Sequence, residues 1–223
     1  AGGTVMEDCR VLEACREGKY TSVLVQTHDK KYVEYRTEHF VNALGSGAGK
    51  LCDSMGIDAG LYPVRHQAFI TRRLPMLGKH GTNLDMLIDR QDYKGFSAVY
   101  GQQIAYTGQI IGCASPKLDA MRIDKNLKVN TKAFLEIVSE MFSEWIPDLA
   151  GVGIQAVWAG YYTEPRYIVD PELGLFVGMR GHGFMLSQYI ARMYVDKLLG
   201  RPVPEYFEKL KLNGPGLSEK AFK

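Results

Sequence analysis

Residues 178–183 place three glycines within six positions, between a short apolar run at 175–177 and a long amphipathic segment. Glycine permits a sharp bend between a strand and a helix, where residues that carry a Cβ would obstruct the chain. After the bend, apolar side chains recur at helical spacing, at Met185, Leu186, Tyr189, Ile190, Met193 and Leu198. Gly200 and Pro202 end this pattern, as is typical of a helix C-terminus. The last third of the sequence therefore predicts a strand, a glycine turn and a helix.

The glycine turn points the first backbone N–H groups of the helix out of the bend. At a helix N-terminus these groups are equivalent to roughly half a positive charge. A planar ring that becomes anionic when reduced, such as the N1/O2 edge of a flavin, is well placed there. Because glycine-rich turns between strands and helices are common, this pattern alone does not identify a ligand.

The rest of the chain alternates extended segments with helices. A polar turn at 28–31 separates two extended runs, 23–25 and 32–35, and predicts a β-hairpin. Further strands are expected at 40–44, 63–71, 96–100, 109–113 and 153–159. A helix is expected where apolar residues follow helical spacing, at Phe134, Leu135, Val138, Phe142 and Trp145. This combination predicts an α/β (or α+β) protein with a mixed sheet.

Composition excludes several classes of protein. Hydrophobic residues make up 46% and charged residues 23% of the 223 residues, which is ordinary for a globular chain. The net charge of +2 is too small to indicate a nucleic-acid surface, and no apolar stretch approaches the ~20 residues that cross a bilayer. Four scattered cysteines favour reduced thiols in the cytoplasm over a disulfide framework or a metal site. Since the first residue is Ala1, we expect a processed chain or a part of a longer protein.

Five segments, taken in order, resemble motifs of the D-amino-acid oxidase superfamily of flavoproteins. The last of them is the glycine turn, Gly-Met-Arg-Gly-His-Gly-Phe at 178–184, which is similar to the C-terminal motif of that family. The other four lie at 40–48, 63–67, 108–112 and 158–165. The segment 158–165, Trp-Ala-Gly-Tyr-Tyr-Thr-Glu-Pro, most resembles the branch of sarcosine, dimethylglycine and glycine oxidases. Each motif is loose, but their common order spans nearly the whole chain.

The resemblance implies an FAD-dependent enzyme that removes a hydride from the carbon beside an amine nitrogen. It implies four stretches: 1–56 as part of the FAD-binding domain, 57–157 as the substrate-binding domain, 158–204 as a return to the FAD-binding domain, and 205–223 as a tail. The C-terminal elements would complete a Rossmann-like FAD domain beside the sheet of the substrate domain. The chain would be the C-terminal portion of such an enzyme.

The resemblance also implies which residues hold the cofactor. The flavin would be lined by Gly178, Met179, Arg180, Gly181, His182, Gly183, Phe184 and Met185. Ala43 and Gly45 would approach the adenosine end, and Val11 would contact adenine through its backbone. Gly160 or a neighbour lies where some sarcosine oxidases carry a cysteine that anchors FAD, so no covalent link is expected there.

Four side chains are candidates for substrate contact. Arg180 would bind a substrate carboxylate bidentately, or else pair with a structural acid or lie at an interface between chains. Tyr161 and Tyr162 alternate along an extended segment, so one is expected to face the cavity and the other the core. His66 replaces the glycine usual in its motif, and is either a substrate contact or a hydrogen-bonded structural residue. His182 is expected to set the glycine bend, with proton transfer as its other role.

The largest departure from the family concerns the loop that binds the dinucleotide. Family members begin with a strand and a helix that carry G-x-G-x-x-G, followed by an acidic residue for the ribose. The glycines at 45–49 have a different spacing and lie where the family has a later turn. We therefore expect the N-terminal FAD-binding portion to be a separate chain, cleaved or separately encoded, that forms a hetero-oligomer with this one.

Three functions stay open at this point. The first is oxidation of a small secondary amine or amino acid, such as sarcosine, dimethylglycine or proline, with electrons passed to oxygen or another acceptor. The second is FAD-dependent oxidation of a 2-hydroxy acid, which other members of the superfamily carry out. The third is a non-catalytic subunit that only holds a partner in a flavoprotein complex.

Overall fold

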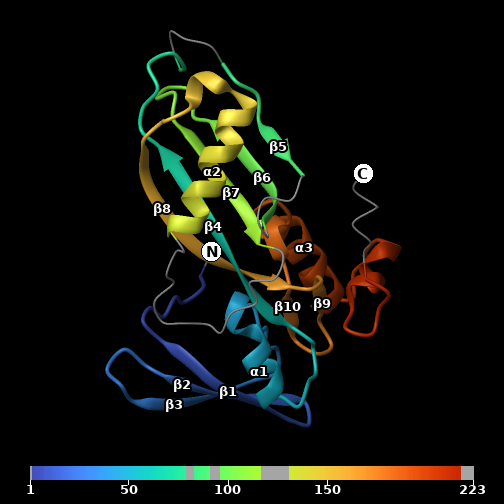
Figure 1. The fold of residues 1–223 in the computed structure, drawn as a ribbon. Coiled ribbons are helices and arrows are strands. Elements are labelled where there is room, and N and C mark those ends of the chain that lie inside the picture. Colours follow the sequence, from blue (N-terminus) through green and yellow to red (C-terminus); the bar gives the residue numbers. More distant parts are fainter. Residues whose placement is uncertain (1, 79–82, 91–95, 117–130, 217–223) are drawn as a thin grey trace. The chain divides into compact units, whose positions relative to one another are not determined.

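Two compact units make up the chain (Figure 1). The computed structural model describes residues 2–78, 83–90, 96–116 and 131–216. The first unit combines Ala1–Tyr62 with Tyr162–Lys223, and the second is the continuous stretch Pro63–Tyr161. The assignment of FAD-binding and substrate-binding roles to particular stretches stays a prediction.

An antiparallel meander opens the first unit. Its strands are β1 (Arg10–Glu17), β2 (Tyr20–Gln26) and β3 (Tyr32–Thr37), paired in the order β1-β2-β3. The N–H of Thr27 donates to the carbonyl of Lys31 at 2.9 Å and closes the polar turn, which confirms the predicted hairpin. The apolar face of the meander buries Ala14, Val23 and Val25 together with Leu51.

A smaller sheet lies at the centre of the first unit. β9 (Ile168–Asp170) pairs antiparallel with β10 (Leu175–Val177). Asn42 joins the other edge of β10 through a parallel bridge to Leu175. The segment that contains Asn42 is therefore the third strand-like element of this sheet.

Successive residues of a strand face opposite sides of the sheet, so this sheet has two apolar faces. A helix covers each of them. The face against α1 (Ala48–Ser54) is formed by Ile168, Leu175 and Val177. The face against α3 (Gly183–Leu198) is formed by Val169 and Phe176. A sheet between two helical layers is the pattern of doubly wound α/β proteins.

Asn42 also holds the turn that leads into α1. Its side chain is fully buried, and Nδ2 donates to the carbonyl of Ala48 at 3.0 Å and contacts Sγ of Cys52 at 3.5 Å. Its Oδ1 accepts the backbone N–H of Leu44 at 3.3 Å. A buried amide that lacked such partners would cost about 1–3 kcal/mol. The hydrogen bonds of the buried Asn42 side chain therefore hold the turn at 43–47 in place.

A five-stranded sheet forms the second unit, in the order β5-β6-β7-β4-β8. In chain order its strands are β4 (Tyr62–Thr71), β5 (Leu87–Asp89), β6 (Phe96–Gln103), β7 (Ile110–Pro116) and β8 (Ile154–Glu164). The pairs β5–β6, β6–β7 and β4–β7 run antiparallel. These five strands form the bulk of the second unit.

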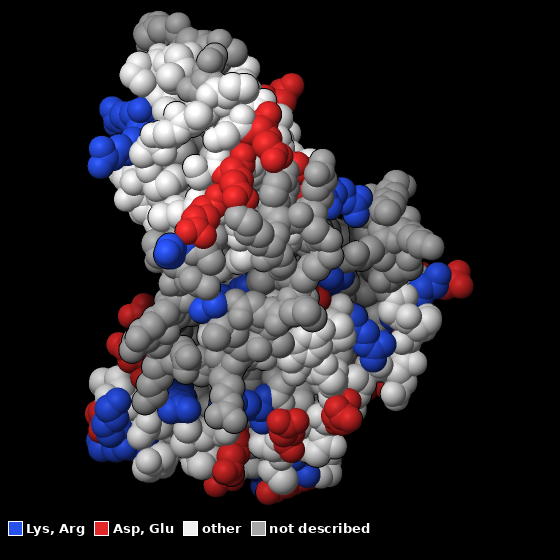
Figure 2. All heavy atoms as spheres, viewed as in Figure 1, with Lys and Arg blue, Asp and Glu red and all other residues white. Residues whose placement is uncertain are grey.

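α2 (Thr131–Trp145) packs into the hydrophobic core of the second unit. Its buried stripe consists of Phe134, Ile137, Val138, Met141 and Phe142. The rings of Phe69 and Phe142 meet edge to face, with centroids 5.4 Å apart. The exposed side of α2 carries three acids at intervals of four residues, Glu136, Glu140 and Glu144. Figure 2 shows an acidic row where α2 lies, so this side of the helix is solvated.

Short 3-10 helices complete the described part of the chain, at Gly45–Gly47, Pro147–Leu149, Arg180–His182 and Glu205–Leu210. No helix in this part is both long enough and apolar enough to span a membrane. The arrangement is the α/β class that the sequence predicts. Several strands are longer than expected: β6 and β7 continue to 103 and 116, and β8 continues past 159 to Glu164 through the strand-favouring residues Tyr161, Tyr162 and Thr163. The strand expected at 40–44 is only an isolated bridge at Asn42.

Candidate functional site

The glycine turn between β10 and α3 begins with an unusually close backbone approach. Gly178 has a φ of +71°, in the left-handed region that residues with a side chain rarely adopt. A Cβ on Gly178 would lie 1.8 Å from the carbonyl oxygen of Arg166. Since that oxygen belongs to the backbone, it cannot move aside cheaply, and only glycine fits.

The other two glycines of the turn make room for side chains. A Cβ on Gly181 would lie 2.8 Å from the ring of Tyr162, and one on Gly183 would lie 2.9 Å from the Cβ of Met179. The Tyr162 ring therefore packs directly against the turn, as an aromatic wall. Tyr162, near the end of β8, thus lies beside the glycine motif.

Arg180 lies inside the turn with a φ of +48° and has an acidic partner. Its Nε is 2.6 Å from Oε2 of Glu164, and the two side chains are only 26% and 15% exposed. A partly buried pair of this kind is screened less by solvent than a surface pair. This is the structural alternative that the sequence leaves open for Arg180; its contact with a substrate stays a prediction.

His182 is held at the turn by a hydrogen bond. Its Nδ1 lies 2.8 Å from the hydroxyl oxygen of Tyr167, which precedes β9. The bond fixes the orientation of the ring at the position just before α3 begins. This geometry agrees with a role in setting the bend.

The N-terminus of α3 has features that suit an anionic ligand. No side chain caps its first N–H groups, and no acidic residue lies in its first turn. Phe184 and Met185 at this end are 99% and 67% exposed. N–H groups without a side-chain cap and the dipole of a 16-residue helix together favour negative charge. The turn from Gly178 to Met185 therefore fits the edge of a flavin that becomes anionic on reduction.

The residues predicted at the adenosine end lie in the same unit as the turn. Gly45 has a φ of +55°, and open space lies where its Cβ would be. It follows Ala43 in the turn that Asn42 fixes. Val11 lies on β1, at the edge of the cluster that packs under α1. Their contacts with a nucleotide stay predictions.

Three predicted site residues belong to the second unit. His66 lies on β4 and is half-buried, and Gly160 and Tyr161 lie on β8. Open space surrounds the position of a Cβ on Gly160. The approach of these residues to the glycine turn stays a prediction.

Two residues near the turn were not predicted from sequence. Glu164 ends β8 and pairs with Arg180, and Arg166 supports the turn through its carbonyl. The guanidinium of Arg166 also donates to the carbonyls of Leu212 and, at 3.0 Å, of Gly214. The sequence does give one signal for these two residues, because a charged side chain lies on each side of Pro165.

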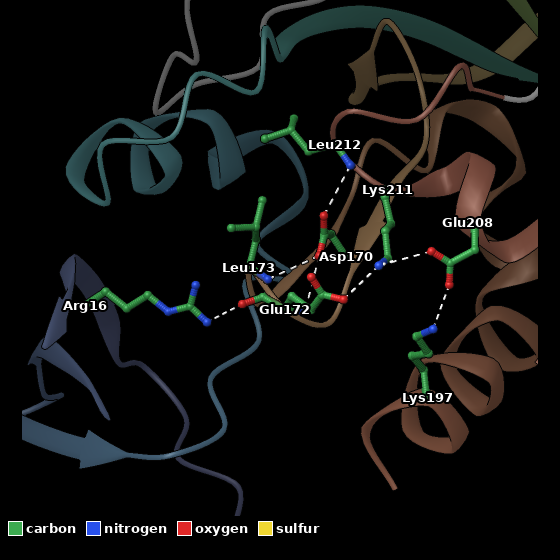
Figure 3. A network of polar contacts seen from close by, with 8 residues as sticks. All are labelled: Arg16, Asp170, Glu172, Leu173, Lys197, Glu208, Lys211 and Leu212. Carbon is green, nitrogen blue, oxygen red and sulfur yellow. Dashed lines mark hydrogen bonds and ion pairs between the residues drawn. The ribbon is translucent and has the colours of Figure 1, made fainter. Parts of the chain in front are cut away.

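A polar network fastens the turn between β9 and β10, at the opposite end of these strands (Figure 3). Oδ1 of Asp170 accepts the N–H groups of Glu172 and Leu173 at 3.1 and 3.2 Å. Oδ2 accepts the N–H of Leu212 at 3.3 Å, which ties in the C-terminal segment. Arg16 of β1 donates to the carbonyl of Glu172. Asp170 is therefore a structural carboxylate that joins parts far apart in the sequence.

Ion pairs extend this network on the surface. Nζ of Lys211 lies 2.7 Å from Glu172 and 3.0 Å from Glu208, and Nζ of Lys197 lies 2.7 Å from Glu208. The hydrogen bond from Lys211 lowers the pKa of Glu172, and those from Lys197 and Lys211 lower the pKa of Glu208. The two carboxylates in turn raise the pKa of Lys211.

A family model matches most of the chain. The model of FAD dependent oxidoreductases (DAO) matches residues 1–197. A doubly wound sheet with a glycine turn before a helix is typical of nucleotide-binding α/β proteins. The chain belongs to this DAO family, whose cofactor is FAD. No curated protein matches it.

Solved structures with a similar fold are amine and amino-acid enzymes by their names. Glycine oxidase from Geobacillus kaustophilus has a TM-score of 0.65 and 18% identity, over 92% of this chain and 52% of that one. Iminodiacetate oxidase from Chelativorans sp. BNC1 has a TM-score of 0.65 and 14% identity, over 94% and 53%. L-amino acid deaminase from Proteus vulgaris has a TM-score of 0.58 and 17% identity, over 92% and 49%. The chain thus spans about half the length of these proteins, and the likeness is one of fold.

Replacing Gly178 by alanine should destabilise the protein strongly. The left-handed φ and the collision with the Arg166 carbonyl together are expected to lower the free energy of unfolding by about 4 kcal/mol. Gly200 is the matched control, since its φ is +68° but nothing lies within 4 Å of its Cβ position. Gly200→Ala should cost only about 1 kcal/mol. Urea denaturation measures both; equal losses would contradict the close approach.

Acidification should weaken the network around Lys211. The pKa values of Glu172 and Glu208 are lowered in the folded protein, so their stabilisation is present above the ordinary value of 4.5 and is lost as the pH falls through the lowered values. We expect the melting temperature to decrease as the pH drops below about 4.5. Lys211→Met should flatten this fall, whereas Lys209→Met, in the 3-10 helix that ends just before Lys211, should not. Identical pH profiles for the two variants would contradict the assignment.

Proposed function

We propose that this chain is the C-terminal portion of an FAD-dependent enzyme that oxidises a small secondary amine or amino acid. The observation that carries the proposal is the uncapped N-terminus of α3 at a turn that only glycine can form. The match to the DAO family over residues 1–197 supports FAD as the ligand of this turn.

When bound, FAD supplies the acceptor for a hydride, and the protein supplies position and electrostatics. Gly178 to Met185 would hold the flavin edge through the N–H groups at the start of α3. The hydrogen bond between Tyr167 and His182 keeps the imidazole in place, so the bend is formed before the ligand arrives. Ala43, Gly45 and the backbone of Val11 would hold the adenosine part. Gly160 offers no thiol for a covalent link.

The substrate class rests on the names of similar structures and on the side chains around the turn. Glycine oxidase and iminodiacetate oxidase are named for substrates with an amine and a carboxylate. Arg180 would meet such a carboxylate, with Glu164 holding its guanidinium from the other side. One of Tyr161 and Tyr162 would line the cavity together with His66.

The enzyme would be completed by a polypeptide that carries the dinucleotide loop. The chain covers 52% of glycine oxidase and lacks the G-x-G-x-x-G motif. We infer that this loop belongs to a further FAD-binding portion that packs against this one. All four cysteines, Cys9, Cys15, Cys52 and Cys113, are free thiols, which supports the cytoplasm as its compartment.

Substrate assays on the isolated complex test this function. Sarcosine, proline, glycine and 2-hydroxyglutarate should be mixed anaerobically with the complex while flavin absorbance is followed. The proposal predicts bleaching by at least one amine substrate and none by 2-hydroxyglutarate. Bleaching by 2-hydroxyglutarate alone would favour a hydroxy-acid dehydrogenase, and a colourless complex would favour a non-catalytic subunit.

Arg180→Met should raise KM selectively. Loss of a charge-assisted bond to a carboxylate is expected to raise KM about tenfold or more for an amino acid. KM for an amine without a carboxylate should not change. Arg192→Met, at an exposed position of α3, is the matched control. If KM rose equally for both substrates, Arg180 would act through its pair with Glu164 and not on the substrate.

A further inference from the structure

The C-terminal hook, residues 205–216, folds back on itself. It consists of the last 3-10 helix and the irregular stretch that follows it. The N–H of Gly214 donates to the carbonyl of Lys211 at 2.9 Å. The N–H of Gly216 donates to the carbonyl of Lys209 at 3.0 Å, and a Cβ on Gly214 would lie only 2.7 Å from the same carbonyl oxygen. The irregular stretch is therefore packed tightly against its own helix.

The C-terminal hook lies along the outer edge of β9. Phe207 and Leu210 are fully buried in the cluster on the α3 side of the small sheet. Leu212 packs against the cluster on the α1 side. Its N–H donates to Oδ2 of Asp170, the last residue of β9 (Figure 3). The hook therefore passes from one face of the sheet to the other, around the edge of β9 that does not pair with β10.

Arg166 connects the C-terminal hook to the glycine turn. Its guanidinium donates to two carbonyls of the hook, that of Leu212 and, at 3.0 Å, that of Gly214. Because the donor carries a full charge, such hydrogen bonds are stronger than those between neutral groups. The carbonyl oxygen of the same residue is the atom that lies against Gly178. Arg166 therefore contacts the hook with its side chain and the turn with its backbone.

Residues 166 and 167 hold the glycine turn at both of its ends. The carbonyl of Arg166 lies against Gly178, where the turn begins. The hydroxyl oxygen of Tyr167 lies 2.8 Å from Nδ1 of His182, the residue just before α3. Because close-packed groups transmit displacements, a shift of residue 166 must move the turn with it. The position of the turn thus depends on what holds Arg166 in place.

We propose that Arg166 is a positioning residue, through which the C-terminal hook sets the position of the glycine turn and of the N–H groups at the start of α3. Arg166 acts on a ligand of the turn only through the backbone of Gly178 and through Tyr167. The consequence for the flavin deepens the proposed function and rests on it. The coupling between the hook and the turn is a property of this chain alone.

Hydrogen exchange in the full chain tests the coupling. Arg166→Met removes both bonds to the hook, so the amides of residues 179–184 should exchange about tenfold faster. The amides of residues 22–26, in the central strand of the meander, should keep the wild-type rate. Arg201→Met is the matched control, because it removes an exposed guanidinium that pairs with Asp196, and it should change neither rate. Equal acceleration of both sets of amides by Arg166→Met, or none at 179–184, would overturn the proposal.

A double-mutant cycle tests whether the hook acts through Arg166. Gly214→Ala places a methyl group against the carbonyl of Lys209, which should displace the Gly214 carbonyl that Arg166 binds. This variant should also accelerate exchange at 179–184. The double variant with Arg166→Met should be slower than the product of the two single effects predicts, because both changes act through one contact. Effects that multiply in full would show that the hook and Arg166 act independently, and would overturn the proposal.

Measurements of FAD in the assembled complex separate this proposal from the proposed function. Arg166→Met should weaken FAD binding about tenfold, whereas Arg201→Met should not. Unchanged FAD affinity of Arg166→Met would overturn the role at the flavin. Faster exchange at 179–184 in a complex that binds no FAD would support the coupling and refute the proposed function. FAD binding and amine turnover, with exchange at 179–184 unchanged by Arg166→Met, would overturn the coupling and leave the function standing.

Discussion

The contact between Gly178 and the backbone of Arg166 is the constraint on which the first unit depends. No residue with a Cβ fits there, because the atom would lie 1.8 Å from a carbonyl oxygen. This close approach ends β10 at the turn that leads into α3, whose N-terminus has no side-chain cap. Tyr162 and the bond between Tyr167 and His182 support the bend from either side. The chemistry proposed for the protein follows from that preformed helix end.

The rest of the first unit keeps this end of the sheet in place. Buried Asn42 holds the second glycine turn at the same end as the first, and the network of Asp170 fixes the opposite end of β9 and β10. Helices cover both faces of the sheet. Fold and function meet at the end of the sheet where both glycine turns lie, since these turns would hold the dinucleotide.

Local patterns in the sequence predicted much of this arrangement. The hairpin of β2 and β3, the apolar stripe of α2 and the strand, turn and helix at 175–198 each depend on residues close together in the chain. The pair of Arg180 with Glu164 and the bond from Leu212 to Asp170 join residues up to 42 positions apart, so spacing alone does not reveal them. The buried role of Asn42 was likewise hidden, because an asparagine beside glycines is also common in exposed turns.

The most direct test of the account is hydrogen exchange at the start of α3 in the assembled complex. Backbone N–H groups of residues 181–186 would be followed with FAD bound and after its removal, with the amides of residues 194–198 as an internal reference. The account predicts that bound FAD slows hydrogen exchange at residues 181–186 by at least about tenfold and leaves exchange at residues 194–198 unchanged. Equal exchange at 181–186 in both states, with FAD demonstrably bound, would contradict it.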